Sequence, residues 1–191
     1  MKTIQLGNEV MVSDPCYVVP TWCQHKLDNV LPGEYFVNVI KSDEGSWGIR
    51  IGALVAIHKD YVNDPLSFRT VKGADIGVDS GQAGIFSMET YRNDEMFKEE
   101  KSDFYGSYDD VQSNTYSKES GDHWYGVMCD KTLGSEQWGA YDNGVVSSSG
   151  YGDGSYDLSV AKHNGKVVGI AIDYLGYKKS AFQTEFEKEL V

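Results

Sequence analysis

Residues 155–175, SYDLSVAKHNGKVVGIAIDYL, contain the clearest local structural signal in the chain. Apolar and polar side chains alternate on both sides of the dipeptide Asn164-Gly165. An Asn-Gly pair between two alternating segments is typical of a two-residue type I′ turn, which joins antiparallel strands. The stretch therefore predicts a β-hairpin with strands over 155–163 and 166–175.

The segment that leads into this hairpin, VVSSSGYGDGSYDLSV (residues 145–160), is rich in glycine and serine. Several glycines in a short ordered stretch usually supply positive φ angles or allow close backbone approach. One interpretation is a β-turn or bulge between two strands. The other is a rigid loop that presents four side chains to a ligand, namely Ser149, Tyr151, Asp153 and Tyr156.

Strand and turn signals also occur in four other regions: 3–13, 35–41, 49–59 and 142–144. In the first of these we expect two short strands that turn at Gly7 and Asn8. Strands at this short spacing, without a βαβ rhythm, predict a mainly β fold. We expect an antiparallel sandwich or a partly open barrel with two or three short inserted helices.

Helical signals are fewer and shorter. Residues 88–103 predict a helix with a solvated charged face, residues 20–30 predict one or two helical turns, and residues 180–191 predict a short docking helix. Residues 122–134 fit a helix and a strand equally well. The length of 191 residues suits a single globular domain, 1–191, with a helix-and-loop insertion around 88–134.

The charge balance and the cysteines restrict the partners and the compartment. With 29 acidic and 17 basic residues, the net charge of -12 and the lack of a basic cluster argue against nucleic-acid binding. Three cysteines without C-x-x-C spacing fit reduced thiols in the cytoplasm. No signal-peptide core or membrane-spanning apolar run is visible. We therefore expect an acidic cytoplasmic protein without nucleic-acid partner, membrane partner or cofactor.

Two further regions supply candidate site residues. In ADIGVDSGQAGIFS (residues 74–87) we expect a strand, a tight turn and a second strand, but the turn matches neither a phosphate-binding loop nor a G-x-S-x-G elbow. Pro15 restricts Asp14 to extended geometry at a strand end, where Asp14 either faces a pocket or caps a turn. The candidate ligand-binding residues, with no metal ligand among them, are Asp14, Tyr17, Asp79, Ser80, Gln82, Ser149, Tyr151, Asp153 and Tyr156.

Several motifs occur in a characteristic order, notably G-V-D-S-G-Q-A-G (77–84) and S-G-Y-G-D-G-S-Y (149–156). In these the chain resembles a family of bacterial and phage proteins known as a domain of unknown function, over nearly its whole length. The resemblance implies a shared β-rich fold and a shared site, but no reaction. Ser87 stands where an aspartate often closes the first motif, which weakens a metal or acid–base role there, and Tyr174 stands where phenylalanine often ends the last strand.

Three hypotheses for the function follow. The leading one is a binding or interaction protein, phage-encoded and acting on a host factor or sequestering a small ligand, because the loops are rich in tyrosine and no catalytic set is recognisable. The second is a carboxylate- or metal-dependent enzyme that uses Asp14, Asp79 and Asp153. The third is a structural or assembly protein. The absence of a recognisable catalytic set favours a protein that is not an enzyme.

Overall fold

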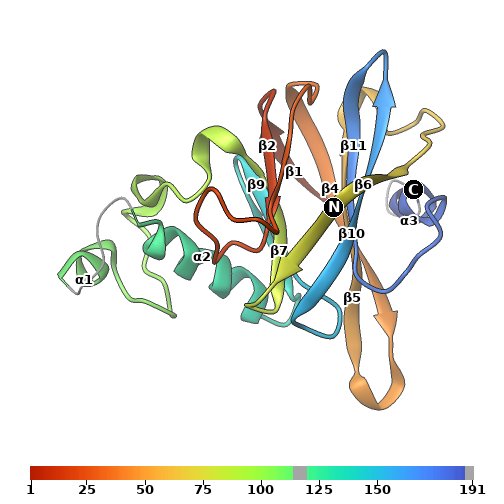
Figure 1. The fold of residues 1–191 in the computed structure, drawn as a ribbon. Coiled ribbons are helices and arrows are strands. Elements are labelled where there is room, and N and C mark those ends of the chain that lie inside the picture. The colour runs from red at the N-terminus through yellow and green to blue at the C-terminus, as the bar shows by residue number, and fades with distance from the viewer. Residues whose placement is uncertain (114–119, 188–191) are drawn as a thin grey trace.

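The structure, a computed structural model, describes residues 1–113 and 120–187, which form two antiparallel β-sheets and short helices (Figure 1). The six-stranded sheet has the order β1-β4-β5-β11-β10-β6, and the five-stranded sheet has the order β3-β2-β7-β9-β8. The first sheet consists of β1 (Lys2–Leu6), β4 (Gly33–Asp43), β5 (Ile49–His58), β6 (Arg69–Val78), β10 (Gly154–His163) and β11 (Lys166–Asp173). The second consists of β2 (Val10–Ser13), β3 (His25–Leu27), β7 (Gln82–Ser87), β8 (Trp138–Tyr141) and β9 (Gly144–Ser148). The expected mainly β, antiparallel fold is confirmed, and neither sheet closes into a barrel.

The hairpin at Asn164 and Gly165 forms as expected. Strands β10 and β11 pair from His163↔Lys166 to Asp157↔Asp173, and both turn residues have positive φ angles, 48° and 78°. These are the angles that a type I′ turn requires. Strand β11 then pairs with β5, which places the hairpin in the interior of the six-stranded sheet.

The main core lies between the inner faces of the two sheets. The five-stranded sheet contributes Val12 and Ile85, and the six-stranded sheet contributes Leu54, Ile170 and other side chains that are almost fully buried. Apolar side chains that face each other across two sheets are the main stabilising term of a sandwich. The core therefore fixes the relative position of the strand ends, and with them the loops that form the candidate site.

Helices cover the outer faces of both sheets (Figure 1). Helix α3 (Ala181–Glu187) buries Phe182 against the six-stranded sheet, as the expected docking helix does, while the Phe186 side chain lies outside what is described. Helix α2 (Asp122–Leu133) buries Trp124 and Met128 against the five-stranded sheet. Helix α1 (Tyr108–Ser113) contacts α2. Within the described residues the open choice over 122–134 is thus settled as a helix.

Three local expectations were wrong. Strands β1 and β2 belong to different sheets, and neither Gly7 nor Asn8 has the positive φ of a hairpin turn. Residues 88–103 contain only the short 3-10 turns η3 (Met88–Thr90) and η4 (Asp94–Phe97) instead of a helix. Residues 20–30 contain the short strand β3 instead of helical turns, because pairing with β2 overrides local propensity there.

Candidate functional site

Three loops that carry most of the sequence-predicted site residues meet at one end of the five-stranded sheet. Strand β2 ends at Ser13, which pairs with Gly84, and β7 begins at Gln82, which pairs with Ser148 at the end of β9. In an antiparallel sheet this alternation brings the end of one strand beside the start of its neighbour. The loops that follow β2 and β9 therefore lie beside the loop that precedes β7.

Asp14 joins two of these loops. Its side chain is fully buried, and its Oδ2 accepts hydrogen bonds from the backbone N–H groups of Asp79 (2.9 Å) and Ser80 (2.7 Å). Its Oδ1 accepts from the Ser80 hydroxyl (2.7 Å) and from the Cys16 N–H (2.8 Å). A buried carboxylate is stable when donors of this kind replace its water. We call Asp14, Asp79, Ser80, Gly81 and Asp153 the Asp14 clamp.

Asp153 joins the third loop to the same turn. Its carboxylate accepts a hydrogen bond from the Gly81 N–H (2.9 Å), and the Ser149 N–H donates to the Gly81 carbonyl (3.0 Å). Gly81 has a φ of +70°, a conformation that suits glycine because a side chain would be strained there. The loop containing Ser149 and Asp153 is thus fixed to the turn before β7.

Tyr151 and Tyr156, both predicted as ligand-binding residues, have different roles. The Tyr156 hydroxyl donates to the Gly152 carbonyl (2.5 Å) and lies 3.0 Å from the Ser149 carbonyl, so it braces the loop from inside. Tyr151 is 58% exposed and hydrogen-bonds Glu44, and its ring contacts the exposed Trp47 with centroids 6.0 Å apart. Of the two tyrosines, only Tyr151 is presented to solvent as the ligand-presenting hypothesis requires.

The other predicted residues also take part in internal contacts. Gln82 is buried and links β7 to α2, since its amide donates to Cys129 Sγ (3.3 Å) and its carbonyl accepts from the Thr132 hydroxyl (3.0 Å). Burial raises the pKa of the Tyr17 hydroxyl, and its hydrogen bond with the Asp79 carboxylate raises that pKa further. The Tyr17 side chain therefore stays neutral at neutral pH. Gln82 and Tyr17 both hold neighbouring segments together.

The nearby thiols are not set up as nucleophiles. Burial, followed by the charge of Asp14, raises the pKa of the Cys16 thiol, and burial raises that of Cys129. A thiol reacts as its thiolate, and an elevated pKa lowers the thiolate fraction at neutral pH. Cys16, Cys23 and Cys129 are all free.

The segments of Asp14, Asp79 and Asp153 do converge, but through backbone groups. Both oxygens of Asp14 already accept two protein hydrogen bonds each. Within residues 1–113 and 120–187, no group of three or more His, Cys, Asp or Glu side chains is placed to hold a metal ion. The geometry of the clamp thus suits a structural junction that positions Tyr151.

A pocket of about 540 Å³ lies elsewhere, between the edge strand β6 and its neighbour β10. It is lined by Ser67, Arg69, Thr70, Val71, Val160 and Lys162, which we call the Arg69 pocket. The pairing of β6 with β10 is interrupted between Thr70↔Ser159 and Asp75↔Asp157. Irregularities of this kind are common beside binding sites.

The lining of the Arg69 pocket combines cations with an apolar floor. Val160 belongs to the main core and Val71 packs against it. Arg69 and Lys162 are exposed, and in the part of the chain that the structure describes neither lies within ion-pair distance of a carboxylate. The pocket therefore offers positive charge beside hydrocarbon in a protein whose net charge is -12.

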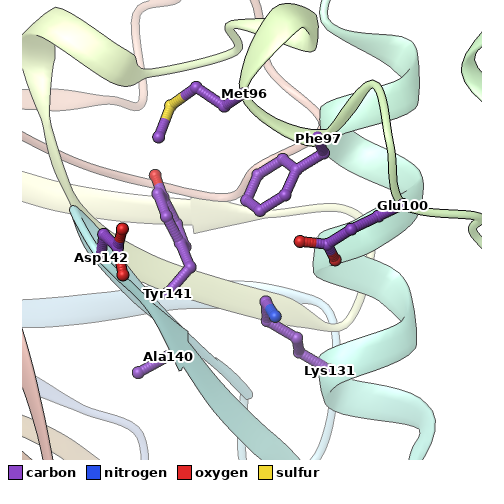
Figure 2. A pocket seen from close by; sticks show the side chains of 7 residues that line it. All are labelled: Met96, Phe97, Glu100, Lys131, Ala140, Tyr141 and Asp142. Atoms are coloured by element: carbon purple, nitrogen blue, oxygen red, sulfur yellow. The ribbon is translucent and has the colours of Figure 1, made fainter.

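A second pocket, of about 280 Å³, lies between η4, α2 and β8. It is lined by Met96, Phe97, Glu100, Lys131, Ala140, Tyr141 and Asp142, which we call the Lys131 pocket. Figure 2 shows the Lys131 amine and the Glu100 carboxylate directed toward the middle of this pocket, beneath the Phe97 ring. Burial lowers the pKa of the Lys131 amine.

Sequence reasoning missed several residues of these sites. The Tyr91 hydroxyl lies 2.7 Å from the Tyr17 carbonyl and 3.2 Å from that of Asp14, and burial raises its pKa to about 12. Neither Tyr91 nor the lysines and arginine of the two pockets belong to a local motif. Their only sequence signal, a polar residue beside a strand or turn, is too common to select them.

Comparisons with known proteins give no match to a protein-family model, to a curated protein or to a solved structure. Membership of the resembled family therefore stays a prediction. Among the described residues, none of the helices has the length and apolar character needed to cross a membrane.

Proposed function

We propose that this protein is a binding protein that holds a small anion with an apolar body in the Arg69 pocket. The observation that carries the proposal is the pair of cations, Arg69 and Lys162, facing one pocket with no carboxylate partner among the described residues. Acidic residues outnumber basic ones by 29 to 17, so carboxylate partners are plentiful in this chain. Two cations left available at one pocket favour an anionic ligand.

The size and the floor of the pocket define the rest of the ligand. Ligand pockets commonly enclose roughly 300–1,000 Å³, and the Arg69 pocket, at about 540 Å³, lies in that range. Val71 and Val160 offer apolar contact to the hydrocarbon part of such a ligand. A carboxylate with a short hydrocarbon chain matches both halves of this lining.

Carboxylate catalysis at the Asp14 clamp is the weaker proposal. A metal ion or a substrate proton would need lone pairs of Asp14 that already accept hydrogen bonds from Cys16, Asp79 and Ser80. Displacing those donors would give up hydrogen bonds to a charged group, each of which contributes roughly 1.5–3 kcal/mol. A binding role requires no such rearrangement.

Isothermal titration calorimetry with octanoate and octanol tests the proposal. We expect octanoate to bind, and Arg69→Gln and Lys162→Gln each to weaken it about 5- to 10-fold, since each removes a charge-assisted contact of roughly 1 kcal/mol. Octanol, which shares the chain but lacks the charge, should bind more weakly. Lys98→Gln is the matched control, because Lys98 is exposed and lies outside the pocket.

Three results would overturn this function. Octanoate could give no binding heat, octanol could bind as tightly as octanoate, or Lys98→Gln could weaken binding as much as Arg69→Gln. The first excludes this ligand class, and the other two show that the pocket cations do not select the anion.

A further inference from the structure

The aliphatic part of the Lys131 side chain packs on strand β8, which fixes the position of the amine. Lys131 lies in the last turn of α2, and a Cβ added at Gly139 of β8 would lie 2.8 Å from its Cβ and 3.0 Å from its Cγ. Glycine at 139 therefore makes room for the stem to pack on the strand. The Nζ lies 5.9 Å from the centroid of the Phe97 ring, so the amine reaches into the Lys131 pocket (Figure 2).

Burial and the neighbouring charges together decide how readily the Lys131 amine loses its proton. Over the described residues no carboxylate lies within ion-pair distance of Lys131 Nζ. Burial is the main cause that lowers its pKa, and Lys2 lowers it further, while the charges of Glu100 and Asp130 act in the opposite direction. A lysine with a lowered pKa is a better nucleophile at neutral pH, because more of it is unprotonated.

The walls of the pocket define what could reach the amine. The ring centroids of Phe97 and Tyr141 are 5.3 Å apart, and the rings meet edge to face. Met96 and Ala140 add further apolar side chains to the wall. Glu100 and Asp142 are the acidic lining residues. The Tyr141 hydroxyl is buried and points toward Met96, away from the Lys131 amine, so Tyr141 contributes its ring to the wall (Figure 2). A neutral aromatic molecule fits this lining better than an anionic one does, because Glu100 and Asp142 repel negative charge.

We propose that Lys131 is a covalent attachment site for small neutral aldehydes, which its amine binds reversibly as an imine inside the Lys131 pocket. The unprotonated Nζ attacks the carbonyl carbon, a C–N bond forms, and a proton passes from nitrogen to oxygen to give a carbinolamine. The C–O bond then breaks and the oxygen leaves as water. The sum is amine plus aldehyde giving imine plus water, without oxidation or reduction.

One other side chain takes part in this step. Glu100 directs its carboxylate into the same space as the amine (Figure 2), where it can hold and return the transferred proton. This site shares no residue with the Arg69 pocket, so a failure of octanoate binding would not contradict the proposal for Lys131.

Borohydride trapping followed by peptide mass mapping tests the attachment. The full chain is incubated with benzaldehyde at about pH 7.5 and reduced, which converts any imine to a stable benzyl-lysine. We expect Lys131 to be the most heavily labelled lysine, because the pocket holds the aldehyde beside an amine whose pKa burial lowers. Lys131→Arg should remove this label, and Lys98→Arg, at an exposed lysine, should leave it unchanged.

The pH profile and a charged analogue complete the test. Labelling of Lys131 should reach half its maximum at a lower pH than labelling of the exposed lysines. Para-carboxybenzaldehyde should label Lys131 less than benzaldehyde does, because Glu100 and Asp142 repel it. Label spread evenly over the lysines, an unshifted pH profile, or equal labelling by the two aldehydes would overturn the proposal.

Discussion

The side chain of Asp14 holds Ser80 at two points. Its carboxylate accepts a hydrogen bond from the Ser80 backbone N–H at 2.7 Å and another from the Ser80 hydroxyl, also at 2.7 Å. Strand β2 ends just before Asp14, and β7 begins just after the turn that contains Ser80. Since β6 belongs to the six-stranded sheet and β7 to the five-stranded sheet, this contact fixes the point at which the chain crosses between the sheets.

We expect Asp14→Asn to lower the free energy of unfolding by about 2–4 kcal/mol. The carboxylate of Asp14 accepts hydrogen bonds on both oxygens, whereas the Asn amide has one acceptor oxygen and would place its NH₂ group against two of the donors. Urea unfolding followed by fluorescence measures the change. Ser80→Ala should cost about 1–2 kcal/mol, since the backbone N–H contact remains. Asp153→Asn, which alters an exposed single contact, is the control. An Asp14→Asn cost no larger than the Asp153→Asn cost would contradict the central role of Asp14.

The parts of the fold that were predictable from sequence are those fixed by neighbouring residues. Asn164 and Gly165 specify their turn by their own φ preferences, and the alternating strands on either side then have one register. The expected hairpin at Asp142–Gly144 also forms, between β8 and β9, but none of these three residues has a positive φ angle. At Asn164 and Gly165, the dipeptide and its two flanking strands are therefore sufficient to predict the hairpin.

Partner choice between distant strands could not be read in this way. Strand β1 pairs with β4 and β2 pairs with β3 and β7, because the hydrophobic faces of two sheets must meet across the core. The same limit applies to the candidate site, where single residues were predictable and their contacts were not. The sequence identified Asp14 and Ser80 as residues of interest, but whether they meet, and whether their polar groups are free, depends on contacts 66 positions apart along the chain.

The turn at Asn164 and Gly165 allows a test of backbone strain. Gly165 has a φ of +78°, and a Cβ added there would meet nothing within 4 Å, so a cost of Gly165→Ala must come from the backbone. We expect a loss of about 1 kcal/mol. Gly134 is a matched control, with equally open space but a φ of -71°. Gly134→Ala should be neutral or slightly stabilising in thermal unfolding, and equal costs at the two glycines would refute the assignment.

The pH dependence of stability should carry a contribution from Asp94. Its carboxylate is 1% exposed and accepts hydrogen bonds from the backbone N–H groups of Gly121 and Trp124, at the start of α2. Burial raises its pKa above the ordinary value of 3.8. The folded state therefore binds this proton more tightly than the unfolded state does, and the resulting stabilisation is present at low pH and lost as the pH rises through the folded-state pKa.

Comparison with Asp94→Asn isolates this contribution. Urea unfolding of both proteins from about pH 4 to neutrality should show the wild type losing stability relative to the variant as the pH rises. The Asn side chain keeps one acceptor but does not titrate, so the other carboxylates cancel in the difference. A wild type that gains stability relative to the variant over this range would show that the two N–H donors outweigh burial.

The two tyrosines of the loop after β9 should separate structure from presentation. Tyr156→Phe removes a hydroxyl that braces Gly152 and Ser149 from inside, so we expect a loss of about 1–2 kcal/mol in urea unfolding. Tyr151→Phe removes only the exposed contact with Glu44, and we expect the stability to stay unchanged within error. Proteolysis should likewise cut the loop faster in Tyr156→Phe alone. If Tyr151→Phe is the more destabilising change, then Tyr151 is a structural residue, and the loop is not a platform that holds it toward solvent.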